Sequence, residues 1–274
     1  MKRLPIFVVD VFTDTAFRGN PAAVVILDQP LSQMRFQEIA AEMKHSETAF
    51  VQRRSGHEFD LRWFTPAMEV PLCGHATVAA AKVLFSEGHT GDVASFHTLS
   101  GHLTVKRSGD DLSLDLPMSL PTAGELPAGC LDALGLNLSE VRQTAVASKL
   151  LIECSNLEQL TGLQPDFHKL GAVKLAGAST GVIVTCMGPP PFDFTSRYFN
   201  PWAGIDEDPV TGAAHAVLAA YWGKRLKKSL MLAHQASARG GILQVKPDFA
   251  QNRVILTGRA VIVLAGQILV DGIS

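Results

Sequence analysis

The chain contains three short blocks that each recur about half its length further on, in the same order. They are RWFTP at 62–66 and RYFNP at 197–201, PLCGHA at 71–76 and PVTGAA at 209–214, and GHLTVK at 101–106 and GILQVK at 241–246. Composition bias explains one such match, but not an ordered series with a slowly growing offset. The sequence therefore predicts two similar domains related by a pseudo-two-fold axis.

Local patterns indicate the elements of the repeated domain. Segments rich in valine, isoleucine, phenylalanine and leucine, separated by turn residues, predict strands at 5–11, 22–27, 47–52, 59–64, 94–99, 102–106 and 112–116. A helix over about 32–44 is amphipathic and is expected on the surface. Helices over about 75–86 and 213–222 are apolar on nearly every side, so other structure must surround them.

These elements predict an α+β fold of two similar domains. Each is expected to be a curved, mainly antiparallel sheet or barrel around a central apolar helix, since strands that neighbour one another in sequence argue against a parallel doubly wound sheet. At roughly 150 residues per domain, 274 residues accommodate both. We expect residues 1–117 to form the first domain, with about 266–274 as a candidate completion, and residues 118–265 to form the second.

Charge and hydropathy exclude several classes of partner. The chain has 24 Lys and Arg against 26 Asp and Glu, which leaves no electrostatic footprint for nucleic acid or an anionic membrane. The apolar stretches 172–187 and 254–270 are interrupted by Lys174 and Arg259, so no transmembrane helix is expected. Four cysteines without a CxxC pair favour a reduced, cytoplasmic setting. A small-molecule enzyme or a binding protein remains.

The two central helices begin in matching places, after Pro-x-x-Gly. A helix start exposes unpaired backbone N–H groups, and Gly74 and Gly212 would let a ligand approach the backbone closely. Two such ends facing a cleft between the domains would hold a small anionic substrate such as a carboxylate. Alternatively, both glycines only permit close packing where a strand turns into a helix.

Differences between the two halves single out candidate chemistry, because structural needs should be shared while chemistry need not be. At four aligned positions a reactive residue in one half is matched by a different residue in the other. The pairs are Cys73 and Thr211, His75 and Ala213, Asp208 and Val70, and Glu47 and Ser179. Glu47, His75 and Asp208 are thus the titratable candidates. Structural alternatives are that Asp208 caps a helix with Pro209 at its first position, and that His75 is a core histidine.

Cys73 has a catalytic and a structural interpretation. At a helix N-terminus it could be a thiolate base, but a two-base epimerase needs a second acid/base opposite, and position 211 is threonine. Packing is the simpler role. The histidines and cysteines show no metal-ligand spacing and no nucleotide-binding glycine loop is present, so neither a metal nor a nucleotide site is expected.

Over its whole length the sequence resembles the PhzF-like phenazine-biosynthesis isomerase family, whose fold is similar to that of diaminopimelate epimerase. The resemblance rests on DVF at 10–12, FRGNPAAV at 17–24, SETAFV at 46–51, RWFTP at 62–66, EVPLCGHAT at 69–77 and EDPVTGAAH at 207–215. It implies a cofactor-free isomerase, a homodimer, and an active site in the cleft between two similar domains.

The resemblance also implies roles for individual residues. Glu47, in the Ser-Glu-Thr motif, would shuttle a proton, with His75 and Asp208 as the other catalytic residues. Substrate-binding positions would be Asn20, Cys73, Gly74, Gly212 and Ala213, the glycine turns holding a carboxylate. Family isomerases commonly carry serine at the position of Ala213, so a hydroxyl contact to the substrate is missing here.

A single carboxylate base predicts a double-bond or keto–enol shift rather than inversion of a stereocentre. We therefore expect a cofactor-independent isomerase acting on a small carboxylate-bearing substrate, with Glu47 as general acid/base. Two alternatives stay open: an amino-acid epimerase or racemase that uses Cys73, and a non-catalytic binding protein on the same fold.

Overall fold

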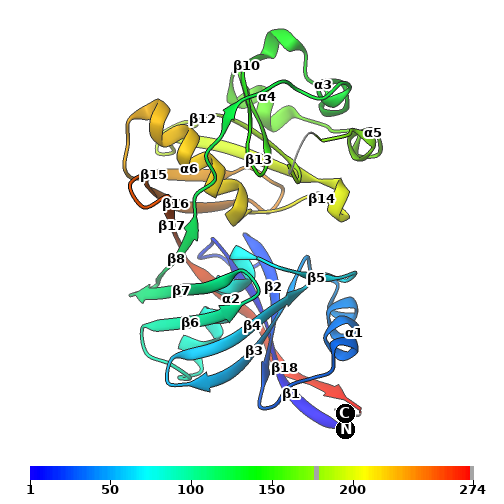
Figure 1. The fold of residues 1–274 in the computed structure, drawn as a ribbon, viewed down its shortest axis with the longest axis vertical. Coiled ribbons are helices and arrows are strands. Elements are labelled where there is room, and N and C mark those ends of the chain that lie inside the picture. The colour runs from blue at the N-terminus through cyan, green and yellow to red at the C-terminus, as the bar shows by residue number, and fades with distance from the viewer. Residues whose placement is uncertain (176–178, 272–274) are drawn as a thin grey trace. The chain divides into compact units, whose positions relative to one another are not determined.

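A computed structural model describes residues 1–175 and 179–271 (Figure 1). The chain divides into two compact units. The first comprises Met1–Leu116 together with the chain from Leu256 onward, and the second comprises Pro117–Ile255. The last strand therefore belongs with the beginning of the chain.

The first unit is a mixed sheet wrapped around one helix. Its strands pair in the order β18, β1, β2, β3, β4, β6, β7, β8, and β5 adds to β4. The bounds are β1 Lys2–Val11, β2 Asn20–Leu27, β3 Thr48–Ser55, β4 Glu58–Phe64, β5 Glu69–Val70, β6 Val93–Thr98, β7 Gly101–Ser108, β8 Asp111–Pro117 and β18 Ala260–Val270. The pairs β2–β3 and β4–β6 are parallel and the others are antiparallel. The helices are α1, Gln33–Met43, and α2, Gly74–Ser86.

The second unit repeats this order. Its strands pair in the order β9, β10, β11, β12, β13, β15, β16, with β14 added to β13 and with β11–β12 and β13–β15 parallel. The strand bounds are β9 Thr122–Ala123, β10 Val141–Val146, β11 Leu150–Cys154, β12 Val182–Met187, β13 Phe194–Asn200, β14 Ile205–Glu207, β15 Met231–Gln235 and β16 Gly241–Asp248. The next strand, β17 Arg253–Gly258, begins in the second unit and ends in the first. The helical segments are α3 Cys130–Leu134, η1 Leu138–Glu140, α4 Leu157–Gly162, α5 Phe167–Ala172, η2 Pro201–Ala203 and α6 Gly212–Leu226.

The central helices are α2 and α6, as the apolar patterns predicted. In α2 every residue from His75 to Ala81 is buried, because small alanines let the surrounding strands approach the helix on all sides. Figure 1 shows α2 enclosed by strands of the first unit and α6 lying against strands of the second unit, to which it belongs. The α+β fold of two similar domains is confirmed.

The surface helix α1 packs its apolar side against the outside of the first sheet. Phe36 stacks on Phe64 with ring centroids 5.2 Å apart and meets Phe50 edge-on at 4.8 Å. Ile39 and Ala40 are buried in the same cluster. Across the described residues no helix has the length and hydropathy needed to cross a membrane.

Candidate functional site

The first unit gathers five of the predicted residues at the start of α2. The chain leaves β5, passes through extended Cys73 (φ −143°, ψ 110°), and enters the helix at Gly74. The hydroxyl of Thr77 donates to the Cys73 carbonyl at 2.6 Å, which fixes the first turn. Backbone N–H groups of this turn have no partner within the helix and point toward its N-terminal end. His75 is 4% exposed, so the turn holds its imidazole inside the protein.

Glu47 reaches the same place from the residue before β3. Its carbonyl accepts the Ala23 N–H at 3.3 Å, which ties the backbone to the neighbouring strand β2. The Glu47 side chain is 14% exposed, and its Oε2 lies 3.3 Å from His75 Nε2 without hydrogen-bond geometry. Burial raises the pKa of the Glu47 carboxyl, and hydrogen bonds from Ser46 and Cys73 lower it by less. A carboxyl whose pKa is raised holds its proton more tightly than an ordinary surface carboxyl.

The imidazole of His75 is contacted at both nitrogens. Asn20 Nδ2 lies 3.3 Å from Nδ1, Cys73 Sγ lies 3.6 Å from Nδ1, and Ser46 Oγ lies 3.4 Å from Nε2. The structure thus brings Asn20, Cys73, His75 and Glu47 together, although 55 positions separate Asn20 from His75. Ser46 was not singled out from the sequence; its place beside Glu47 in the Ser-Glu-Thr motif was the available signal.

The turn before β2 explains how Asn20 enters this cluster. Gly19 has φ +65°, and a Cβ there would lie 2.2 Å from the Val11 carbonyl oxygen. Only glycine fits such a close approach in the left-handed region. The Arg-Gly-Asn sequence therefore folds tightly back and starts β2 at Asn20, which is fully buried.

The second unit holds Asp208 in front of α6. Asp208 is 7% exposed, its carboxylate accepts a hydrogen bond from the Thr211 hydroxyl, and its carbonyl accepts Gln235 Nε2 at 2.6 Å. Gln235 Oε1 in turn accepts the Thr211 N–H at 2.9 Å. The helix begins at Gly212 with Thr211 as its N-cap. The alternative in which Asp208 is the N-cap residue is therefore wrong.

The small residues at the start of α6 lie in the predicted places. Gly212 is buried and opens the helix, and Ala213 occupies its first turn half-buried. The backbone N–H groups of this turn lack partners within the helix, as do those at the start of α2. Because the side chain of Ala213 is a methyl group, any contact of this position with a polar ligand comes from its backbone.

Lys149, which was not a candidate from the sequence, lies close enough to Asp208 for their charges to interact. Lys149 is 9% exposed, its ammonium donates to the Thr180 hydroxyl, and it lies 5.6 Å from the centroid of the Tyr198 ring. Burial lowers the pKa of Lys149 to about 8, and the charge of Asp208 opposes that shift. No motif marks Lys149, because only the tertiary structure buries it.

Strand register corrects one predicted equivalence. Thr48 pairs with Phe64, and Val182 pairs with Phe199, which is the repeat counterpart of Phe64. The residue before each strand is therefore Glu47 in one unit and Gly181 in the other, not Ser179. Gly181 has φ +102°, and a Cβ there would lie 2.3 Å from Tyr198 Oη. Tyr198 thus fills the place where the second unit would need a side chain equivalent to Glu47.

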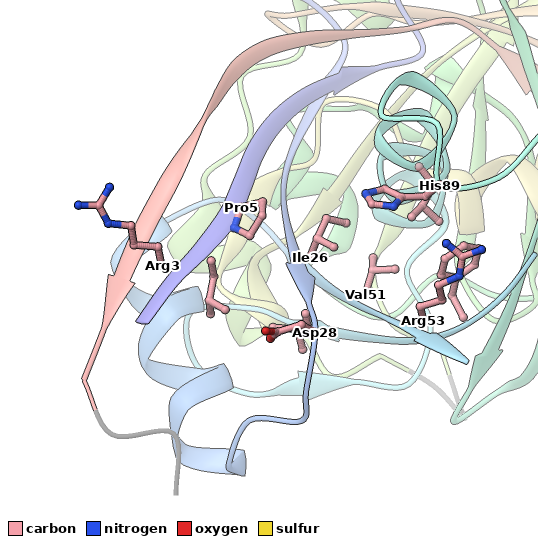
Figure 2. A pocket seen from close by; sticks show the side chains of 11 residues that line it. Arg3, Pro5, Ile26, Asp28, Val51, Arg53 and His89 are labelled. Atoms are coloured by element: carbon pink, nitrogen blue, oxygen red, sulfur yellow. The ribbon is translucent and has the colours of Figure 1, made fainter. Parts of the chain in front are cut away.

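A separate cavity of about 450 Å³ opens at the other end of α2 (Figure 2). Leu84 lines it near the C-terminal end of that helix, together with Ile26, Val51 and Phe59 from the strands. At 1.5 Å of rise per residue, Leu84 lies about 15 Å along the helix axis from Gly74. Its lining contains none of the predicted site residues, so it is distinct from the Glu47 cluster.

Comparison with known proteins places the chain in one family. The family profile described as phenazine biosynthesis-like protein, PhzC-PhzF, matches residues 9–266. Phenazine biosynthesis-like domain-containing protein 1 of Mus musculus is 43% identical, over 96% of this chain and 98% of that protein. An uncharacterized isomerase of Pseudomonas aeruginosa is 44% identical with the same coverage. A crystal structure of a PhzF-family protein of Enterococcus faecalis has a TM-score of 0.91 at 38% identity, covering 98% of this chain and 100% of that chain. The chain belongs to the PhzC-PhzF family of phenazine biosynthesis-like proteins.

Proposed function

We propose that the protein is a cofactor-independent isomerase that moves a proton on a small carboxylate-bearing substrate. The observation that carries the proposal is Glu47, a buried carboxyl beside His75 at the N-terminal end of α2. A buried acid next to backbone N–H donors combines a proton carrier with an anion-binding site. The isomerase name of the Pseudomonas aeruginosa relative supports the same reaction class.

In the proposed mechanism Glu47 acts first as a base. As the anion it removes a proton from a carbon that an adjacent carbonyl or unsaturated system makes acidic, and the electron pair moves into that system. The N–H groups of the first turn of α2, starting at Gly74, hold the substrate carboxylate. His75 stabilises the negative charge that develops on the substrate. Glu47 then returns the proton to another carbon, so the atoms of the substrate are conserved.

The second unit would contribute binding groups to the same reaction. Asp208 is proposed to orient the substrate, and the N–H groups of Gly212 and Ala213 to bind a polar group on it. Cooperation of the two clusters in a cleft between the units stays a prediction. It is tested by Asp208→Asn, which should lower turnover of any substrate that Glu47 acts on.

The epimerase alternative rests on a specific contact. Cys73 Sγ lies 3.6 Å from His75 Nδ1, so the imidazole could accept its proton and leave a thiolate nucleophile or base. Position 211, the repeat counterpart of Cys73, is threonine, and Thr211 is engaged with Asp208 and Gln235. The second acid/base of a two-thiol epimerase is thus replaced by a residue with a hydrogen-bonding role.

Solvent-deuterium exchange into a panel of small carboxylates separates these functions. The isomerase should incorporate deuterium with a shift of a double bond, and Glu47→Gln should lose at least about 100-fold of that exchange, since a positioned acid/base contributes this much. Cys130→Ala, which removes a buried thiol of the second unit, should retain exchange, and Cys73→Ala should retain more of it than Glu47→Gln. Near-normal exchange by Glu47→Gln would overturn the proposal. Racemisation abolished by Cys73→Ala would favour the epimerase, and binding without exchange by any variant would favour a binding protein.

The expected homodimer and cytoplasmic location stay predictions. Sedimentation velocity of the purified full chain tests the first, and microscopy of a tagged chain in its source cells tests the second.

A further inference from the structure

Three side chains of the types that ligate metals converge in the first unit. One donor atom each from Glu47, Cys73 and His75 lies within 4.8 Å of the other two. Cys73 and His75 belong to the helix start, and Glu47 comes from the edge of β3, so three different backbone positions supply one cluster. This approach was invisible in the sequence, because neither a Cys-x-His pair nor a distant glutamate is a recognised ligand spacing.

The donor spacing is close to that of a tetrahedral metal. Metal bonds of 2.0 to 2.3 Å at tetrahedral angles put neighbouring donors about 3.3 to 3.6 Å apart. Cys73 Sγ lies 3.6 Å from His75 Nδ1, and Glu47 Oε2 lies 3.3 Å from His75 Nε2. These contacts are made to different nitrogens of the His75 ring. One side chain must therefore rotate before Cys73, Glu47 and a single nitrogen of His75 can ligate the same ion. The donors already lie within 4.8 Å of one another, so side-chain rotation is the change that metal binding requires.

The cluster contains an oxygen suited to a ligand role. Glu47 Oε2 is buried and makes no hydrogen bond to any residue in the described part of the chain. A buried carboxylate oxygen without a donor is costly, and a cation relieves that cost. With Cys73 as thiolate and Glu47 as carboxylate, a divalent cation would leave the site neutral.

The donor set selects the type of cation. A thiolate and an imidazole prefer borderline-soft ions such as Zn²⁺, whereas Mg²⁺ and Ca²⁺ require mainly oxygen ligands. Three protein ligands also leave the fourth tetrahedral position open to water or to a carboxylate. Asn20 Nδ2 lies 3.3 Å from His75 Nδ1, so with the metal on Nε2 the Asn20 amide would have to turn and accept the Nδ1 N–H with its oxygen, as outer-shell partners of metal ligands do.

We propose that Glu47, Cys73 and His75 bind one Zn²⁺ ion in a site that competes with the acid/base role of Glu47. On binding, the six-coordinate aqueous Zn²⁺ ion releases five waters, takes a sulfur, a nitrogen and an oxygen from the protein and keeps one water in the fourth tetrahedral position, and the Cys73 thiol releases its proton to solvent. The ion is an inhibitor and not a cofactor. Only this inhibitory consequence rests on the proposed function; the binding site itself does not.

Anaerobic titration of the purified full chain with Co²⁺ tests the ligand set. Co²⁺ replaces Zn²⁺ in such sites and gives a near-ultraviolet sulfur-to-cobalt charge-transfer band when a thiolate is bound. We expect the band to saturate at one equivalent, to disappear on addition of Zn²⁺, and to be lost in Cys73→Ala. Cys130→Ala, which removes a buried thiol of the second unit, should keep it. Absence of the band in the wild type, or its persistence in Cys73→Ala, would overturn the proposal.

Competition with a chromophoric chelator measures the other two ligands. Glu47→Gln and His75→Asn should each weaken Zn²⁺ binding about tenfold or more, because loss of even an outer-shell partner costs that much. Circular dichroism of each variant shows whether it is folded, and Cys73→Ser provides a second thiol variant if Cys73→Ala is not. Unchanged Zn²⁺ affinity in both folded variants would contradict the site.

The inhibitory consequence has its own measurement. Zn²⁺ at one equivalent should stop deuterium exchange by the wild type, and a chelator should restore it. If the wild type exchanges no substrate, the proposed function fails while the cobalt band and the zinc affinities still decide the binding site. If exchange continues with Zn²⁺ bound, the inhibitory role is wrong although the site exists.

Discussion

At the scale of single residues, the buried titratable side chains differ in whether the sequence could identify them. Glu47 and His75 could be named from the sequence, because a motif and a difference between the two halves marked them. Lys149 could not, since nothing in its neighbourhood in the sequence indicates that its ammonium lies against Tyr198 and near Asp208. Which lysine is desolvated depends on how β11 and β12 pair, and single-sequence patterns do not contain that information.

The buried ammonium of Lys149 predicts a pH dependence of stability. Its pKa is lowered from 10.5 to about 8 in the folded chain, so between these values the unfolded chain binds more protons and stability rises with pH. Below pH 8 the folded chain bears the full cost of the buried charge. Relative to Lys149→Met, the free energy of unfolding of the wild type should therefore increase by about 3 kcal/mol from pH 7 to pH 10.5. Urea unfolding of both proteins across this range measures it, and parallel pH profiles would contradict it.

Gly181 predicts a steric effect at the position equivalent to Glu47. In Gly181→Ala the new Cβ would lie 2.3 Å from Tyr198 Oη at φ +102°, so both the backbone and the tyrosine must move. We expect a loss of about 3 kcal/mol of unfolding free energy. Gly56→Ala is the matched control, since φ is +53° there and a Cβ meets open space. Equal losses in the two variants, measured by chemical denaturation, would show that the contact with Tyr198 is unimportant.

At the scale of elements, the strands and helices with a strong hydrophobic period were predicted nearly to their ends. The helix expected over 75–86 begins at Gly74, and that expected over 213–222 runs from Gly212 to Leu226, where Lys224 and Arg225 continue it into solvent. The short strands β5 and β14 were missed, because two or three residues show no period. Each of these strands contains a glutamate that forms an ion pair with an arginine of the neighbouring strand, Glu69 with Arg62 and Glu207 with Arg197.

The repeated ion pairs predict different costs in the two units. Arg197 holds Glu207 of β14 through two bonds of 2.7 and 2.8 Å and also donates to the Leu163 carbonyl at 2.8 Å, with 11% of its side chain exposed. Arg62 holds Glu69 of β5 in the same way but is 36% exposed. Arg197→Met should cost about 3 kcal/mol, because it leaves both the Glu207 carboxylate and the Leu163 carbonyl without their arginine donor, whereas Glu69, exposed to the same 18%, keeps a hydrogen bond from Gln33. Arg62→Met should cost within about 1 kcal/mol. Thermal unfolding of the two variants gives the comparison, and a larger cost at Arg62 would contradict it.

At the scale of the whole molecule, duplication is what the sequence conveyed best. The three recurring blocks reappear as β4 and β13, as the starts of α2 and α6, and as β7 and β16. What the repeat could not convey is where each half ends. The strand after β8 is β9, which pairs with β10 of the second unit, and the strand after β17 is β18, which pairs with β1 of the first. Hydrophobic patterns identify such strands but not their partners, because pairing depends on contacts between distant parts of the chain.

This exchange of terminal strands predicts the effect of shortening the chain. Without β18, β1 loses the pairing along one edge over its whole length and keeps β2 as a partner only from Ile6 to Val11, and Leu4 and Ile6 lose their contacts with Ile268 and Val270 in the core cluster. An unpaired strand edge exposes backbone groups to water and to other chains. A chain ending at Gly258 should therefore lose amide protection in β1 and aggregate, whereas a chain ending at Asp271 retains β18 and should match the full protein. Hydrogen exchange with mass spectrometry reads β1 and β12 separately, so it also shows whether damage stays within the first unit. Unchanged protection of β1 in the shorter chain would mean that β18 is dispensable and that the first unit closes without it.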